Sequence, residues 1–154
     1  MIFVTTGSAG FDELAEEIDR LSPELKEKVI VNIGYGNYKP KNCEWVGYTD
    51  KFEDYVKKAD LIITHGGAGT IFTCLKSGKK IIAVPNKRHE DDQNDLVRKL
   101  SEGRYLIDCE NLDDLEKCVE RARKFKFKKY NSPKCEISDR ILGFLGDLSN
   151  PTPP

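Results

Sequence analysis

The sequence predicts an α/β fold in which a single Rossmann-like parallel sheet of about six strands is flanked by helices. Short β-branched runs alternate along the chain with longer stretches whose apolar residues recur at helical spacing. One run, Leu61-Ile62-Ile63, is apolar at every position, as expected for a parallel strand covered on both faces. The length of 154 residues suits one domain. We therefore expect one domain over residues 1–148 and a disordered, proline-rich tail over residues 149–154.

The first half of the chain contains three clear strand patterns, one weaker strand pattern and two helical patterns. A strand is expected where β-branched residues gather, and a helix where apolar residues recur every three or four positions. Either Thr49 or Asp50 can cap the second helix with a side-chain oxygen. In order, the expected elements are a strand at 1–5, a helix at 10–21, strands at 29–33 and 44–47, a helix from about 49 or 50, and a strand at 61–64.

The second half continues the alternation. Gly78 suits the left-handed turn that ends many helices, and Pro85 stops a strand. Asn111 is a good helix cap, and the proline of Ser132-Pro133 fits a first helical turn. In order, the expected elements are a helix at 70–77, a strand at 80–84, a helix at 91–101, a strand at 104–107, a helix after 111 and a last helix from 132.

Composition excludes several classes of function. Charged residues make up 33% of the chain, yet the formal net charge is only −1, so no general attraction to nucleic acid is expected. The apolar runs are too short to cross a bilayer, and no signal-peptide pattern opens the chain. The five cysteines contain no CxxC pair, which favours small buried residues over a zinc site or a disulfide framework. We therefore expect a soluble cytoplasmic protein that binds no nucleic acid.

One strong charge asymmetry remains, the basic stretch at residues 121–129. It is explained either as the solvated end of a helix, where cations suit the helix dipole, or as a surface that faces a membrane or an acidic partner.

Three loops carry residues suited to ligand binding. In a sheet of this class, ligands bind beyond the carboxyl ends of the strands. The loops expected there lie at residues 5–10, 65–70 and 86–93. The second, His65-Gly66-Gly67-Ala68-Gly69-Thr70, opens a helix, where small residues let a ligand approach free N–H groups and the dipole favours an anion. A diphosphate is the expected occupant, and the alternative is a tight turn that uses glycine only for packing.

Two nucleotide motifs are absent from the sequence. The first loop reads Gly7-Ser8-Ala9-Gly10, not GxGxxG, and no acidic strand end follows at the distance that the dinucleotide fingerprint requires. No GxxxxGK[ST] segment occurs either. We therefore expect neither an NAD site nor a P-loop.

Several segments, taken in order, resemble a known family. Residues 59–70, 78–85 and 92–93 resemble the donor-binding half of glycosyltransferases of the B fold, of the family 28 C-terminal type. Residues 2–8 and 31–36 are similar to small stand-alone members. These are the cytosolic subunit of the two-part UDP-N-acetylglucosamine transferase of N-glycan assembly and its bacterial counterparts in exopolysaccharide synthesis. The resemblance covers nearly the whole chain.

The resemblance implies a donor-binding catalytic subunit of a heteromeric glycosyltransferase. It would move a hexose unit, of the N-acetylglucosamine, glucose or glucuronate type, from a UDP-sugar to a polyprenyl-linked acceptor. A membrane-anchored partner protein would bind this lipid-linked acceptor and recruit the subunit to the cytosolic face of the membrane. The UDP-sugar is the donor substrate, and no separate cofactor is implied. The implied donor-site residues are Gly7, Ser8, Tyr48, Thr49, His65, Gly66, Gly67, Ala68, Gly69, Thr70, Thr73, Asp92 and Gln93.

One position departs from the family pattern. Many relatives carry a glutamate that accepts the ribose hydroxyls where this chain has Thr73. A threonine makes one such bond rather than a charge-assisted pair, which favours the polysaccharide branch of the family.

The chemistry expected of the site is electrostatic. The amides of the glycine loop and the Thr70 hydroxyl would stabilise the departing UDP, and no carboxylate cluster with metal-ligand spacing occurs, so no metal is expected. His65 is the one candidate catalytic side chain; we expect it to contact the donor, and the base to come from the partner. His89 is expected to be a solvated loop residue. The alternatives are a non-enzymatic nucleotide-sugar-binding regulatory subunit and an α/β domain whose glycines only form turns.

Overall fold

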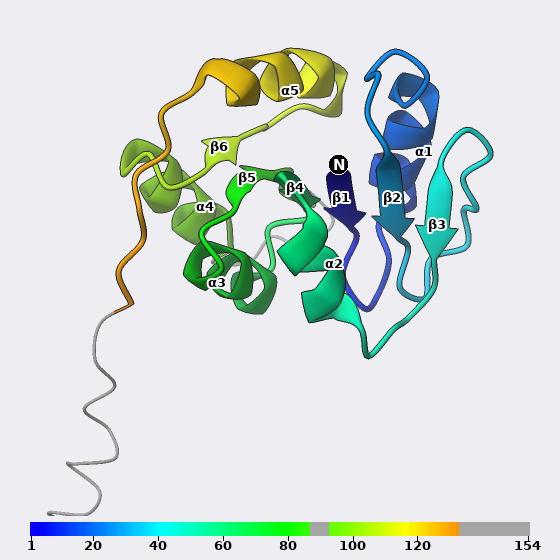
Figure 1. The fold of residues 1–154 in the computed structure, drawn as a ribbon, viewed down its shortest axis with the longest axis horizontal. Helices are drawn as coiled ribbons and strands as arrows, with labels where there is room; N and C mark the ends of the chain where they lie inside the picture. Colours follow the sequence, from blue (N-terminus) through cyan, green and yellow to red (C-terminus); the bar gives the residue numbers. More distant parts are fainter. Residues whose placement is uncertain (87–92, 133–154) are drawn as a thin grey trace, which may run out of the picture.

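The fold is a six-stranded parallel sheet with the strand order β3-β2-β1-β4-β5-β6. The structure is a computed structural model, and it describes residues 1–86 and 93–132. Figure 1 shows β1, β2 and β3 side by side, with their arrowheads at one edge of the sheet. The strands are β1 (Ile2–Thr5), β2 (Val29–Asn32), β3 (Glu44–Val46), β4 (Leu61–Thr64), β5 (Lys80–Ala83) and β6 (Ile107–Asp108). The predicted fold class is confirmed.

Helices cover both faces of the sheet. Side chains alternate along each strand, so Ile2 and Val4 of β1 pack on one face while Phe3 packs on the other. The first face is covered by α1 (Asp12–Leu21) and α5 (Leu115–Lys124), the second by α2 (Phe52–Lys58), α3 (Ala68–Lys76) and α4 (Gln93–Glu102). The strands β1 and β4 are buried at every position, which explains their uninterrupted apolar character.

Some element boundaries differ from the sequence prediction. The sixth strand begins at Ile107 rather than at 104, because Arg104 takes a left-handed conformation (φ 63°) in the turn that ends α4. The N–H of Tyr105 closes that turn by donating to the carbonyl of Leu100. Helix α3 begins at Ala68, two residues earlier than predicted. Asn111 caps a short 3-10 turn (Leu112–Asp114) that precedes α5. The predicted last helix and the tail lie outside the described residues, apart from Ser132.

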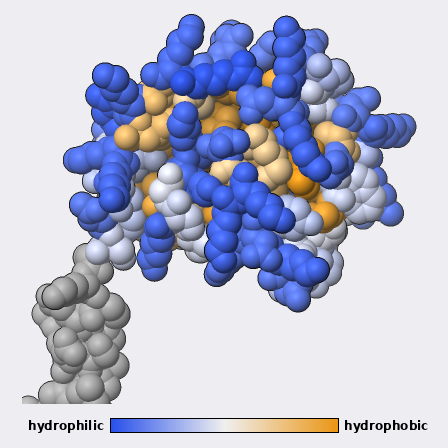
Figure 2. Space-filling model, viewed as in Figure 1, coloured by the Kyte–Doolittle hydropathy of each residue, from blue (hydrophilic) through white to orange (hydrophobic). Residues whose placement is uncertain are grey.

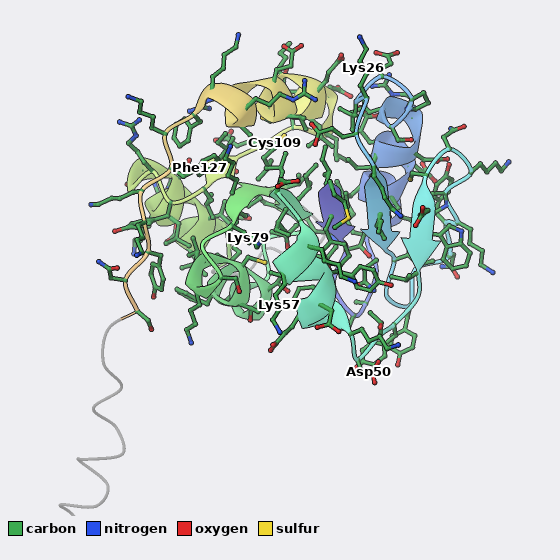
Figure 3. The ribbon with its side chains drawn as sticks, viewed as in Figure 1. Lys26, Asp50, Lys57, Lys79, Cys109 and Phe127 are labelled. Atoms are coloured by element: carbon green, nitrogen blue, oxygen red, sulfur yellow. The ribbon has the colours of Figure 1, made fainter. Side chains whose placement is uncertain are left out.

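The start and end of α2 show how local signals act. Its N-cap is Lys51, so neither Thr49 nor Asp50 occupies the cap, although the Thr49 hydroxyl accepts the N–H of Lys51 at 3.1 Å. At its end, the Lys79 ammonium donates to the carbonyls of Lys57 at 2.7 Å and Ala59 at 2.9 Å; Lys57 and Lys79 are labelled in Figure 3. A cation at this end also suits the helix dipole.

The basic stretch divides its residues between core and solvent. Phe125 and Phe127 pack on the core of the α1 and α5 face, and Lys126 and Lys128 are exposed. The aromatic residues of this stretch therefore serve the fold.

The thiols within the described residues are free, and all but one are buried. Cys74, Cys109 and Cys118 lie in the core, and Cys43 is half-buried. Burial raises the pKa of the Cys74 thiol to about 12, so it remains protonated and unreactive.

The surface is predominantly hydrophilic on the face shown in Figure 2. Within the part of the chain that the structure describes, no helix is long and apolar enough to cross a membrane.

A buried carboxylate holds the connection between β2 and β3. Asp19 of α1 is only 3% exposed, and its oxygens accept the N–H groups of Lys41 at 2.9 Å and Asn42 at 2.6 Å and the Tyr38 hydroxyl at 2.8 Å. Burial alone would raise the pKa of Asp19, but these donors outweigh it and hold the pKa below its ordinary value. The ionised carboxylate therefore stabilises the fold.

We expect Asp19→Asn to lower the free energy of unfolding by about 2 kcal/mol at neutral pH, because the amide brings an NH₂ group among donors. Since the folded-state pKa of Asp19 lies below its unfolded value, its contribution is present above about pH 4 and is lost as the pH falls further. Urea unfolding at pH 7 and pH 3 should therefore show a smaller acid-induced loss in the variant than in the wild type.

The control is Glu17→Gln, which removes an exposed ion pair with Arg20 on the same helix and should cost less than about 0.5 kcal/mol. Equal effects of the two substitutions would contradict the role assigned to Asp19.

Candidate functional site

The strand order reverses between β1 and β4, and two loops meet there. Thr5 and Thr64 are paired in register at the carboxyl ends of these strands, so the loops that follow begin side by side. The N–H of His65 donates to the carbonyl of Thr5 at 3.3 Å, which continues the pairing beyond the strands. The chain then enters α1 on one face and α3 on the other. A crevice at such a switch point is the usual ligand site of a doubly wound sheet.

Glycine occurs at three positions of the second loop, and two of these positions have a structural reason for it. Gly66 has a φ of +93°, a conformation that other residues rarely adopt. A Cβ at Gly67 would lie 2.5 Å from the His65 Nε2 atom, so a side chain there would force the imidazole to move. Gly69 has neither reason, because it lies inside α3 and a Cβ there would meet no described atom within 4 Å. Its small size leaves open space at the start of the helix.

The His65 ring lies between the two loops. A Cβ at Gly7 would come within 2.6 Å of its Cε1 atom, so the ring contacts the backbone of both Gly7 and Gly67. Its Nδ1 atom is 3.5 Å from the Thr64 hydroxyl. The half-buried imidazole therefore positions the loops relative to each other, besides any contact that it makes with a ligand.

The N-terminus of α3 is electrostatically open. No side chain of the described residues caps it, and its first turn contains no acidic residue. The first turns of α1, α2, α4 and α5 each contain at least one. Negative charge near a helix N-terminus is stabilising. Among the described α-helices, α3 is the one whose first turn supplies no negative charge of its own.

A cleft of about 210 Å³ adjoins the start of α3. Its lining comes from the ends of β1 and β2, the loops after β1 and β3, and the first turns of α2 and α3. The lining residues are Thr5, Gly7, Ser8, Asn32, Tyr48, Thr49, Phe52 and Thr70. Five of these, Gly7, Ser8, Tyr48, Thr49 and Thr70, are residues that the sequence predicts for the site. In Figure 3, the label of Asp50 marks the chain as it leaves this region toward α2.

The site residues predicted from the sequence do not include Asn32 and Phe52, although Asn32 lies in the segment 31–36 that resembles the family. Asn32 is buried, and its side-chain amide donates to the Gly47 carbonyl at 2.6 Å, which fixes the segment that carries Tyr48 and Thr49. A polar residue at the end of the apolar run Val29-Ile30-Val31 was the available signal. Phe52 gave no such signal, because its spacing also fits an ordinary core position of α2.

The other predicted residues lie around the cleft or beyond the described chain. His65, Gly66, Gly67, Ala68 and Gly69 form the loop that leads directly to Thr70. Thr73, one turn along α3, donates its hydroxyl to the Gly69 carbonyl at 2.9 Å and does not belong to the cleft lining. Gln93 is the first residue of α4. Asp92 and His89 lie outside the described residues.

Neighbouring hollows at the same edge have a different character. One is lined by residues that include Glu13 and Glu110, and another includes Asp108 and Glu110. Burial, with Glu110 nearby, raises the pKa of Asp108, and one of its oxygens is buried without a hydrogen-bond partner among the residues that the structure describes. These carboxyl groups disfavour an anionic ligand, whereas none of the described residues that line the cleft beside α3 carries a carboxylate. Among residues 1–86 and 93–132, no group of three or more His, Cys, Asp or Glu side chains is placed to hold a metal ion.

The glycine loop yields a paired test. We expect Gly67→Ala to lower the free energy of unfolding by about 1–3 kcal/mol, because the new methyl group displaces the His65 ring. Gly69→Ala should raise it by about 0.5–1 kcal/mol, because an alanine in open space favours the helix. Urea unfolding measures both changes, and a stability loss at Gly69 as large as that at Gly67 would contradict this description.

The chain resembles curated glycosyltransferases. It is 27% identical over 122 residues to the human UDP-N-acetylglucosamine transferase subunit ALG13, covering 70% of this chain and 11% of that protein. The Yarrowia lipolytica protein of the same name is 27% identical over 161 residues, covering 92% of this chain and 82% of that protein. The chain thus spans about a tenth of the length of the human relative and most of the yeast one.

Solved structures share the fold. An NMR structure of ALG13 superposes with a TM-score of 0.60 at 18% identity, covering 92% of this chain and 94% of that one. Acinetobacter baumannii MurG superposes with a TM-score of 0.61 at 20% identity, covering 80% of this chain and 42% of that one. The described sheet and helices therefore correspond to half of a glycosyltransferase B fold. The model of the glycosyltransferase family 28 C-terminal domain matches residues 1–142, and the chain belongs to this family.

Proposed function

We propose that this chain is the donor-binding subunit of a heteromeric glycosyltransferase that transfers a hexose unit from a UDP-sugar to a polyprenyl-linked acceptor. The observation that carries the proposal is the open N-terminus of α3, uncapped, free of acidic residues and beside a polar cleft. Among the sugar types that the sequence suggests, the names of the relatives favour N-acetylglucosamine.

The diphosphate binds at the first turn of α3. The N–H groups of Ala68, Gly69 and Thr70 have no acceptor one turn earlier in the helix, so they are available to phosphate oxygens. The open space at Gly69 lets the phosphates approach the backbone, and the Thr70 hydroxyl in the cleft adds a donor. The nucleoside then extends along the cleft toward Tyr48 and Thr49.

Catalysis by this subunit is electrostatic. As the bond between the sugar and the diphosphate breaks, negative charge grows on UDP next to the α3 amides, which are already oriented by the helix. His65 holds the loops that present these amides, and its ring would donate to a phosphate or a sugar hydroxyl. Asp92 and Gln93 would contact the sugar or the ribose. The base that activates the acceptor comes from the partner.

The partner supplies the acceptor half of the enzyme. The chain is 29% identical to part of a Prochlorococcus marinus transferase whose name includes a pyrophosphoryl-undecaprenol acceptor, and the match covers 32% of that protein. A membrane-anchored protein that binds a lipid-linked acceptor would fill the equivalent role here and hold this subunit at the cytosolic face of the membrane.

A charge reversal at Gly69 tests the proposal. We expect Gly69→Asp to weaken UDP binding more than tenfold relative to Gly69→Asn, because a carboxylate about 4 Å from a phosphate repels it by about 4 kcal/mol at an effective dielectric constant of 20. The two side chains have nearly the same volume, and an acidic residue in the first turn leaves the helix intact. Isothermal titration calorimetry with UDP and UDP-N-acetylglucosamine measures the difference.

Two outcomes would overturn the proposal. One is wild-type protein that binds no uridine nucleotide, and the other is equal affinity in both Gly69 variants. Co-expression with candidate membrane partners, followed by a transfer assay on a lipid-linked acceptor, then separates an enzyme subunit from a regulatory one, since only the enzyme transfers sugar.

A further inference from the structure

Two exposed tyrosines stack on each other beside the cleft. Tyr35 is 69% exposed and Tyr48 is 66% exposed, and with Trp45 they are the large apolar side chains that the described surface leaves most open. Their rings lie nearly parallel, at 7°, with centroids 5.2 Å apart. A stacked pair that buries so little surface contributes little to the stability of the core. Its position beside a cleft therefore points to a role in ligand binding.

The backbone of Tyr35 is tied to the first loop. Its N–H donates to the Ser8 carbonyl at 2.9 Å, and the N–H of Gly36 donates to the Ile33 carbonyl at 2.8 Å. Gly34, at a φ of +58°, packs so closely against the Gly7 and Ser8 carbonyls that no side chain fits between them. This turn therefore has one position relative to the cleft, although the Tyr35 ring itself projects into solvent.

Tyr48 belongs to a less constrained segment. It lies in the connection between β3 and α2, where the Asn32 amide holds the Gly47 carbonyl. The Tyr48 ring stacks on the Tyr35 ring. The firmly held turn after β2 thus sets the orientation of a ring that lines the cleft.

We propose that Tyr35 is a positioning residue for the nucleobase: it holds the Tyr48 ring so that the uncovered face of that ring stacks on the base of the donor. One face of Tyr48 is covered by Tyr35, which leaves the other face for the ligand. A ring held in place before binding loses less conformational freedom when the base arrives. This inference rests on the proposed donor site, and it separates base recognition, at the tyrosine pair, from diphosphate recognition, at α3.

The separation predicts a selective loss. Stacking of one base on an aromatic side chain is commonly worth a factor of about ten or more in affinity. We therefore expect Tyr35→Ala to weaken UDP binding about tenfold and to leave the affinity for inorganic pyrophosphate unchanged. Tyr35→Phe, which retains the stacked ring, should bind UDP within about twofold of the wild type.

Trp45→Ala provides the matched control. Trp45 is 40% exposed, lies under the Lys39 ammonium and does not belong to the cleft lining, so its removal should not change UDP affinity. Calorimetric titration of each folded variant with UDP and with pyrophosphate provides the comparison, and circular dichroism checks the fold. In a complete enzyme with its partner, Tyr35→Ala should raise the KM for the UDP-sugar while kcat changes little.

The outcomes separate this inference from the proposed function. If the wild type binds neither UDP nor pyrophosphate, the donor site itself is wrong. If the wild type binds UDP and Tyr35→Ala binds it equally well, the positioning role is wrong and the donor site stands. A parallel loss of UDP and pyrophosphate affinity would also overturn the inference, because it would show that Tyr35 supports the whole loop rather than the base.

Discussion

The pairing of β4 with β1 is the constraint on which the rest of the site depends. Thr5 and Thr64 are paired in register, so the loops that follow β1 and β4 begin side by side. The first loop leads to α1 on one face of the sheet, and the second leads to α3 on the other face. The His65 ring lies between the two loops. Because the ring lies so close to the backbone on both sides, the neighbouring positions, Gly7 and Gly67, are glycines. The open start of α3 is therefore positioned by the core of the sheet, where β1 and β4 are buried at every position.

The glycines show how local geometry separates structural from functional requirements. Backbone conformation explains Gly66, and contact with the imidazole explains Gly67. Neither explains Gly69, which sits within a helix where glycine is unfavourable by roughly 1 kcal/mol relative to alanine. The packing of the described residues does not require glycine at this position, and the diphosphate that we propose at the α3 amides would account for it.

The sequence predicts the fold well where the signals are local and repeated. The apolar run at β4 and the spacing of α1 follow from burial alone, and the order of the motifs, through the family resemblance, predicts that Tyr48 and Thr70 lie near Gly7. It does not predict contacts between distant side chains. Asp19 sits on the inner face of α1, and its donors Lys41 and Asn42 come from 22 and 23 residues along the chain. The stack of Tyr35 on Tyr48 is also a contact that the sequence does not predict, because only the folded sheet brings the turns after β2 and β3 together.

The position of the diphosphate is the central claim, and amide chemical shifts test it most directly. Titration of ¹⁵N-labelled protein with UDP should produce its largest shifts at the N–H groups of Ala68, Gly69 and Thr70, with a second set at Tyr48 and Thr49, where we propose that the base binds. Largest shifts instead around Glu110 and Leu112, in the neighbouring hollow, would contradict the account.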